Sequence, residues 1–308
     1  MARPISVSLH VGVHKTASTH LQKTLARNAS LLRDNGVGFV GPESLRQPGQ
    51  SLQALFGLGD RADAPGGHDA QAQLRRLAGD GAARLVISEE NALGPMFGEG
   101  APGPLYPNAD LRIERLIRAL APSPVRLFVG LREPAGWLAS VYRHKLFNGS
   151  YPTFDDFAGG VDPAALRWSN LIERLRRVGG VERLYVWRQE DYPAVAGPVF
   201  RRMLGWKLGP QVARIEGRVN EGLSHKAVEQ LLRWGESDDP RGAARKARAL
   251  FPITTPESRF APWPAAVLAR SRAAYDADIA RIADIAGADL LRPARRLQPS
   301  RGRAAEAP

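Results

Sequence analysis

Short apolar runs that alternate with helical segments constrain the fold of this chain more than any other feature. The runs lie at residues 5–13, 37–40, 84–88, 125–131 and 182–187, and their branched residues are typical of buried strands. Apolar residues at helical spacing occupy much of the sequence between them, including residues 19–35 and 110–121. Strands separated by helices predict a parallel sheet with helices on both faces. The predicted fold class is therefore α/β.

The pattern changes after Val219, where the sequence predicts helices only, at residues 224–234, 241–250 and 264–285. We expect these helices to pack on the sheet domain rather than form a domain of their own. Residues 1–291 would then be a single α/β domain with a mainly helical C-terminal part from about residue 220. Residues 292–308 combine Arg, Pro, Ala and Gly without apolar periodicity, which predicts a basic, disordered tail.

The charge balance favours anionic partners. The 308 residues carry a formal net charge of +12, which suits a nucleotide, an acidic glycan, nucleic acid or a phospholipid surface. Cysteine is absent, which excludes disulfides and thiolate metal sites. The short stretch before the first strand predicts no signal peptide, and no apolar run reaches membrane-spanning length. We expect a soluble, cytoplasmic protein without a transmembrane segment; the oligomeric state does not follow from the sequence.

Polar residues gather where the first predicted strand meets the first predicted helix, in "HVGVHKTAST", residues 10–19. A helix N-terminus offers unpaired amides and the positive end of the helix dipole, so Lys15 and the hydroxyl residues around it can hold a phosphate or sulfate there. The nucleotide-triphosphate P-loop requires a glycine before its lysine, and His14 occupies that position. The alternative is an ordinary helix start with Ser18 as N-cap and a solvated Lys15.

The stretch "HKTAST" resembles the 5'-phosphosulfate loop of sulfotransferases that use 3'-phosphoadenosine 5'-phosphosulfate. The resemblance implies that Lys15 contacts the phosphosulfate and its leaving oxygen. It also implies that Thr16, Ser18 and Thr19 bind the 5'-phosphate. Ala17 belongs to the same cofactor-binding loop, at a position where the family usually has glycine, and its methyl group can restrict the loop.

A second stretch, "LREPAGWLASVYRH" at residues 131–144, resembles the 3'-phosphate segment of the same family. The resemblance implies that Arg132 and Ser140 hold the 3'-phosphate. Ser140 lies two predicted helical turns beyond the strand end, and an arginine presents a planar fork to a phosphate. The alternative is that Arg132 pairs with a carboxylate such as Glu133 and that Ser140 is only a small helical residue.

The resemblance covers roughly residues 5–230 at the level of motifs. It extends to "LYVWRQEDY" at residues 184–192, and "RVNEGLSHKAVE" at residues 218–229 is similar to a region of bacterial carbohydrate-type members. The Gly-rich loop with Lys-Gly pairs found in cytosolic small-molecule members is absent from the C-terminal part. A carbohydrate acceptor therefore fits better than a small molecule.

Sulfuryl transfer needs a base for the acceptor hydroxyl, and "LVISEEN" supplies a candidate in Glu89. Related enzymes often carry His or Glu at the end of the strand before the 3'-phosphate strand. Alternation along a strand predicts that Glu89 and Glu90 point in different directions and that one of them enters the cleft. A helix cap or an ion pair with an arginine is the alternative role.

Together these features predict a sulfotransferase with a P-loop-like α/β fold. It would transfer a sulfuryl group from 3'-phosphoadenosine 5'-phosphosulfate to a hydroxyl, on a carbohydrate by preference. Lys15 and Glu89 are the predicted catalytic residues, and neither a metal nor a nucleic-acid partner is expected. A small nucleotide-dependent kinase and a basic nucleic-acid-binding protein are the alternatives.

Overall fold

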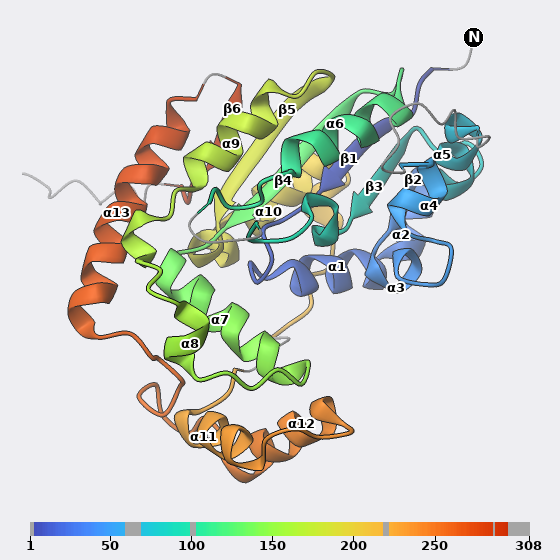
Figure 1. The fold of residues 1–308 in the computed structure, drawn as a ribbon. Helices are drawn as coiled ribbons and strands as arrows, with labels where there is room; N and C mark the ends of the chain where they lie inside the picture. The colour runs from blue at the N-terminus through green and yellow to red at the C-terminus, as the bar shows by residue number, and fades with distance from the viewer. Residues whose placement is uncertain (1–2, 59–68, 99–102, 218–221, 286, 295–308) are drawn as a thin grey trace, which may run out of the picture.

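The chain folds around one sheet of six parallel strands, ordered β2-β3-β1-β4-β5-β6 (Figure 1). This computed structural model describes residues 3–58, 69–98, 103–217, 222–285 and 287–294. The strands are β1 (Ser6–His10), β2 (Val37–Val40), β3 (Arg84–Ser88), β4 (Val125–Leu131), β5 (Val181–Arg188) and β6 (Ala288–Leu291). The α/β class and the parallel sheet predicted from the sequence are confirmed.

Helices connect the strands and cover the sheet. They are α1 (Ser18–Arg27), α2 (Ala29–Asp34), α3 (Pro42–Leu45), α4 (Leu52–Phe56), α5 (Ala70–Ala78), α6 (Ala109–Leu120), α7 (Pro134–Phe147), α8 (Phe154–Ala158), α9 (Trp168–Arg177), α10 (Tyr192–Leu204), α11 (His225–Trp234), α12 (Pro240–Leu250) and α13 (Ala265–Ala283). Single 3-10 turns lie at η1 (Glu90–Leu93), η2 (Pro163–Ala165), η3 (Gln189–Asp191) and η4 (Gly209–Gln211).

Two buried clusters lie on opposite faces of the sheet. On one face, alternate strand residues such as Leu9 and Leu127 pack against α5, α6, α9 and α13. On the other face, residues such as Val86 and Phe128 pack against α1, α2 and α10. Because both faces are covered, the central strands read as nearly continuous apolar runs. That is why they were easy to predict from the sequence.

The sixth strand corrects the expectation of a purely helical chain after Val219. Helix α13 ends at Ala283, and the chain then forms β6, which pairs in parallel with β5. The strand is four residues long, includes Asp289, and is only partly buried throughout. A short edge strand with an acidic residue lacks the apolar run that marks a central strand. The tail predicted from residue 292 lies outside the described residues from residue 295 on.

The helix predicted over residues 19–35 is two helices, α1 and α2, that meet at Asn28. The Asn28 amide nitrogen donates to the carbonyls of Thr24 (2.7 Å) and Ala213 (2.9 Å), and its amide oxygen accepts from the Ala213 N–H (3.1 Å). This contact with a remote segment favours the break. Helix α10 begins at Tyr192, and Pro198 lies inside it.

The C-terminal helices α11 and α12 pack on α7 rather than on the sheet (Figure 1). Their apolar residues form a third buried cluster with Tyr142 and Leu146 of α7 and with Phe260. Helix α13 instead lies beside α9 and β6, next to the sheet. No helix in the described ranges is long and apolar enough to cross a membrane.

Candidate functional site

The loop between β1 and α1 has an unusual backbone. Gly12, Lys15 and Ala17 all have positive φ, at 37°, 68° and 66°. A Cβ at Gly12 would lie 2.9 Å from Ser18 Oγ and 3.0 Å from His10 Nε2, so this position requires glycine. Left-handed backbone at a lysine and an alanine costs conformational energy, and such strain concentrates at functional sites.

The first turn of α1 begins without a side-chain cap, because the N-cap residue is Ala17. Ser18, expected as N-cap in the ordinary reading of this segment, lies inside the helix. It is 7% exposed, and its hydroxyl has no hydrogen-bond partner within the described residues. The orphan amides of a helix start and an enclosed hydroxyl are suited to an anion's oxygens.

Lys15 stands beside this helix start with no ion pair or hydrogen bond to its ammonium in the described part of the chain. Burial lowers the pKa of Lys15 to about 8. The Glu90 carboxylate opposes this shift, whereas the charges of Arg46, Arg143 and Arg132 add to it. An enclosed ammonium surrounded mainly by other cations is stabilised by a bound anion.

The two threonines of the loop differ in their surroundings. Thr16 is buried, and its hydroxyl donates to the Val13 carbonyl at 2.6 Å. Its hydroxyl proton is therefore already used within the loop. Thr19 is the second residue of α1 and is partly buried. Of the predicted phosphate-binding hydroxyls, that of Ser18 is the one with an unused, enclosed oxygen.

The second predicted motif lies directly beside the first. Arg132 follows β4, and its Nη1 donates to the Lys15 carbonyl at 3.0 Å. Burial lowers the pKa of Arg132, while Glu190 and Glu133 oppose the shift. Ser140 is partly buried, eight residues further along the chain in α7. The structure thus brings Arg132 into contact with the backbone of Lys15.

Two arginines that the sequence analysis missed complete a group of cations beyond Arg132. Arg143 is one helical turn after Ser140, and its Nη1 donates to the Phe260 carbonyl at 3.4 Å. Burial lowers the pKa of Arg143 to about 10, and the charges of Arg132 and Arg259 lower it further. Arg143 could have been found from the sequence, because it lies three residues after Ser140 in the same predicted helix and therefore on the same side of it. Arg259 comes from the distant segment before α13 and carries no such signal.

Two tryptophan side chains donate hydrogen bonds to backbone carbonyls in the two motifs. The Trp137 indole N–H donates to the His14 carbonyl at 2.9 Å, and that of Trp168 donates to the Arg132 carbonyl at 2.8 Å. The two buried indoles meet edge to face at a centroid distance of 5.1 Å. One aromatic pair therefore links the loop before α1 to the end of β4.

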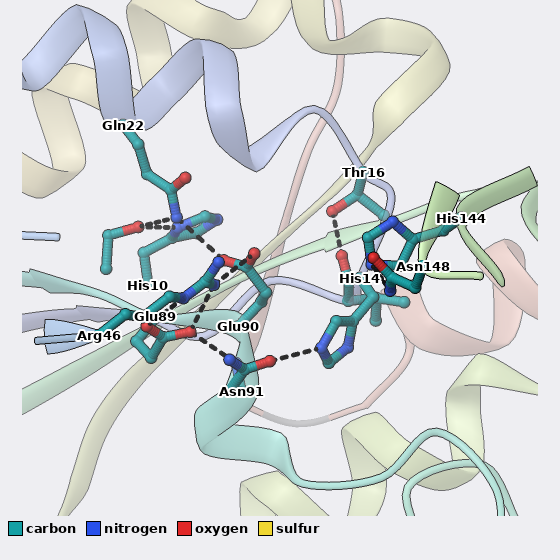
Figure 2. A network of polar contacts seen from close by, with 12 residues as sticks. His10, His14, Thr16, Gln22, Arg46, Glu89, Glu90, Asn91, His144 and Asn148 are labelled. Carbon is teal, nitrogen blue, oxygen red and sulfur yellow. Dashed lines mark hydrogen bonds and ion pairs between the residues drawn. The ribbon is translucent and has the colours of Figure 1, made fainter. Parts of the chain in front are cut away.

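Glu89 lies at the end of β3 in a polar network with Arg46 (Figure 2). Its Oε1 accepts from Arg46 Nη2 (2.8 Å) and from the Asn91 amide (3.0 Å), and its Oε2 accepts from Arg46 Nε (3.2 Å). The side chain is 6% exposed and caps η1. The cap and ion pair expected as the alternative are therefore both present.

Glu90 shares the same arginine instead of pointing away from it. It accepts from Arg46 Nη2 at 2.9 Å and from the Gln22 amide at 3.0 Å (Figure 2). Burial raises the pKa of Glu90, but hydrogen bonds from its own backbone amide, Arg46 and Gln22 outweigh it and hold the pKa at about 2. The charge of Glu90 raises the pKa of Lys15. Its role therefore differs from that of Glu89, which caps η1.

Two histidines flank Lys15. His14 uses both ring nitrogens: Nδ1 meets the Tyr106 hydroxyl at 2.8 Å and Nε2 meets Asn91 Oδ1 at 3.0 Å. His144 lies in the last turn of α7, with one ring nitrogen 3.3 Å from the Asn148 amide (Figure 2). Burial lowers the pKa of His144 to about 4, helped first by the charge of Lys15. His144 is exposed on the surface of α7.

Comparisons of the chain with protein-family models, curated proteins and solved structures find no match. No group of three or more His, Asp or Glu side chains able to hold a metal occurs within the described residues. Fold and site together define an α/β protein whose parallel sheet carries a basic, strained loop at its carboxyl edge. Parallel sheets of this kind bind ligands at that edge.

Proposed function

We propose that the protein is a sulfotransferase that uses 3'-phosphoadenosine 5'-phosphosulfate and a carbohydrate hydroxyl as its substrates. The observation that carries the proposal lies at the start of α1, which has no side-chain cap. Within the described residues, neither the Lys15 ammonium nor the buried Ser18 hydroxyl has a hydrogen-bond partner there. Both groups are suited to the oxygens of a phosphosulfate. The resemblance of both sequence motifs to that family supports the same assignment.

A second group of cations supports a cofactor with two separate phosphate groups. Arg132 and Arg143 are both partly buried. The charge of Arg132 lowers the pKa of Arg143, and the charge of Arg259 lowers the pKa of both, as expected when cations are held together for an anion. Ser140 lies on α7 one turn before Arg143. In this proposal these three residues bind the 3'-phosphate, and Ser18, Thr19 and the loop amides bind the 5'-phosphate.

The proposed reaction forms a bond between the acceptor oxygen and sulfur as the bond from sulfur to the 5'-phosphate oxygen breaks. Negative charge then develops on that leaving oxygen. The Lys15 ammonium and the amides at the start of α1 stabilise this charge without rearrangement. The acceptor proton passes to a base, and adenosine 3',5'-bisphosphate leaves.

In this proposal the base is His144 rather than Glu89. The His144 Nε2 already faces the Asn148 amide, so Nδ1 is the ring nitrogen that would accept the proton. Both Glu89 oxygens are already occupied by Arg46 and Asn91. His144 has the charge of Lys15 as its first electrostatic influence, and its pKa of about 4 keeps the ring neutral at pH 7. A bound phosphosulfate adds negative charge beside it and raises this pKa toward the range where histidine is an effective base.

Thermal denaturation with three ligands tests the proposal. Adenosine 3',5'-bisphosphate should raise the melting temperature at concentrations where ATP with magnesium and a short DNA duplex have little effect, because only a ligand bound to the folded state stabilises it. Stabilisation by ATP with magnesium alone would support the kinase alternative. Stabilisation by DNA that weakens steeply with salt would support nucleic-acid binding.

A further inference from the structure

A hollow of about 360 Å³ opens at the amino edge of the sheet, where β2 and β3 begin and α10 ends. Lys15 lies at the opposite, carboxyl edge, so this hollow is separate from the site proposed above. Its described lining residues include two cations and no acidic side chain. The residues used below are Arg84, Trp206 and Lys207.

Trp206 forms one wall and is unusually accessible. Its side chain is 67% exposed, whereas Trp137, Trp168 and Trp187 are fully buried. The guanidinium of Arg202 lies 5.2 Å from its ring centroid and that of Arg201 lies 6.0 Å away. An exposed indole supported by arginines offers a flat apolar surface within a positive field.

Arg84 contributes an unused cation to the same hollow. Its Nε is enclosed and has no hydrogen-bond acceptor among the described residues. Burial lowers the pKa of Arg84, and the charge of Arg126 adds to this effect. Arg126 itself has a structural role, because it donates to the carbonyl of Arg202 at the end of α10 and to Ser6. Arg84 donates no comparable hydrogen bond to any residue that the structure describes.

We propose that this hollow binds an acidic sugar residue, with the pyranose ring against Trp206 and the acidic group near Arg84 and Lys207. The ring supplies apolar C–H groups to the indole, and the carboxylate or sulfate meets the cations. The absence of acidic side chains from the described lining favours an anion over a neutral sugar. The net charge of +12 raises the local concentration of such ligands.

The test follows the indole N–H signals of the full-length, ¹⁵N-labelled protein while a glucuronate-containing disaccharide with one sulfate is added. The Trp206 signal should shift and saturate, and cellobiose, a neutral disaccharide, should bind at least about tenfold more weakly because it lacks the charge-assisted contacts. Equal binding of cellobiose, or no shift at Trp206, would overturn the proposal. A binding result at Trp206 does not depend on whether Lys15 binds nucleotide.

Three variants locate the site by calorimetry. Trp206→Ala and Lys207→Gln change exposed residues and should each weaken disaccharide binding, Trp206→Ala by about tenfold or more. Trp234→Ala is the matched control, because that indole is also exposed and has Lys246 at 5.4 Å but lies on α11. Unchanged affinity in Trp206→Ala would contradict the proposal. So would tighter binding of a DNA oligonucleotide than of the disaccharide through the same residues.

Discussion

The guanidinium of Arg132 donates a 3.0 Å hydrogen bond to the backbone carbonyl of Lys15, 117 residues earlier in the chain. This bond joins the loop before α1 to the end of β4. It also ties a cation assigned to one phosphate to the strained loop that presents Lys15 to the other. A hydrogen bond therefore connects the two halves of the proposed nucleotide site directly.

Arg132→Lys should expose this coupling. The lysine keeps the positive charge but lacks the planar fork that can serve both a phosphate and the Lys15 carbonyl. We expect bisphosphate affinity to fall by roughly tenfold, from the loss of a charge-assisted hydrogen bond, and turnover to fall as well because the Lys15 loop is released. Calorimetry and sulfuryl-transfer assays measure the two effects. Arg118→Lys, at an exposed position of α6, is the control and should change neither.

Lys15 should give nucleotide binding a distinctive pH dependence. Its pKa of about 8 in the free protein means that the ammonium loses its proton as pH rises through that value. An anion binds the protonated form better, so bisphosphate affinity should decline above about pH 8. Lys15→Arg keeps the charge at every accessible pH and should remove this decline. A pH profile that is the same in both proteins would show that Lys15 does not face the nucleotide.

Three substitutions distinguish the candidate bases. His144→Asn should lower turnover by roughly 10²- to 10⁴-fold with bisphosphate affinity nearly unchanged, as expected for loss of a general base. Glu90→Gln should alter bisphosphate affinity, because Glu90 acts on Lys15. Glu89→Gln tests the base predicted from sequence. If Glu89→Gln alone abolishes turnover while the protein stays folded, the sequence-based assignment is correct and His144 is not the base.

Asp278 should be important for stability rather than for binding. This buried carboxylate of α13 accepts from the amides of Trp168 (2.7 Å) and Ser169 (3.1 Å) and from the Ser169 hydroxyl (2.5 Å). Asp278→Ala leaves these donors unsatisfied and should lower the free energy of unfolding by about 2–4 kcal/mol in urea denaturation. Asp276→Ala is the control on the same helix. Asp276 is 63% exposed and pairs with Arg188, so its loss should cost under about 1 kcal/mol.

The central part of the fold could be predicted because its strands are buried on both faces. The run 125–131 has its predicted bounds in β4, and 84–88 has them in β3. The edge strand β6 escaped prediction because four partly buried residues with an aspartate carry too little apolar pattern. Similarly, the break at Asn28 depends on Ala213, a contact between segments far apart in the chain.

The sequence predicts those residues of the candidate site that belong to short motifs next to strand ends. Lys15 lies in the loop after β1, Ser18 begins α1, and Arg132 follows β4 directly. Parallel strands bring their carboxyl ends to one edge of the sheet. The sequence could not show that the Glu89 carboxylate already accepts hydrogen bonds from Arg46, because Arg46 lies far away in the chain, at the end of α3. Arg259 and the indole contacts of Trp137 and Trp168 also depend on tertiary packing.

Calorimetric titration with adenosine 3',5'-bisphosphate and adenosine 5'-phosphate tests the central claim most directly. The two ligands differ only in the 3'-phosphate, for which Arg132, Arg143 and Ser140 are proposed to be the binding residues. Charge-assisted contacts of about 1.5–3 kcal/mol predict a preference for the bisphosphate of roughly 10- to 150-fold, which Arg132→Ala should largely remove. Equal affinity for the two nucleotides in the unmodified protein would contradict the account.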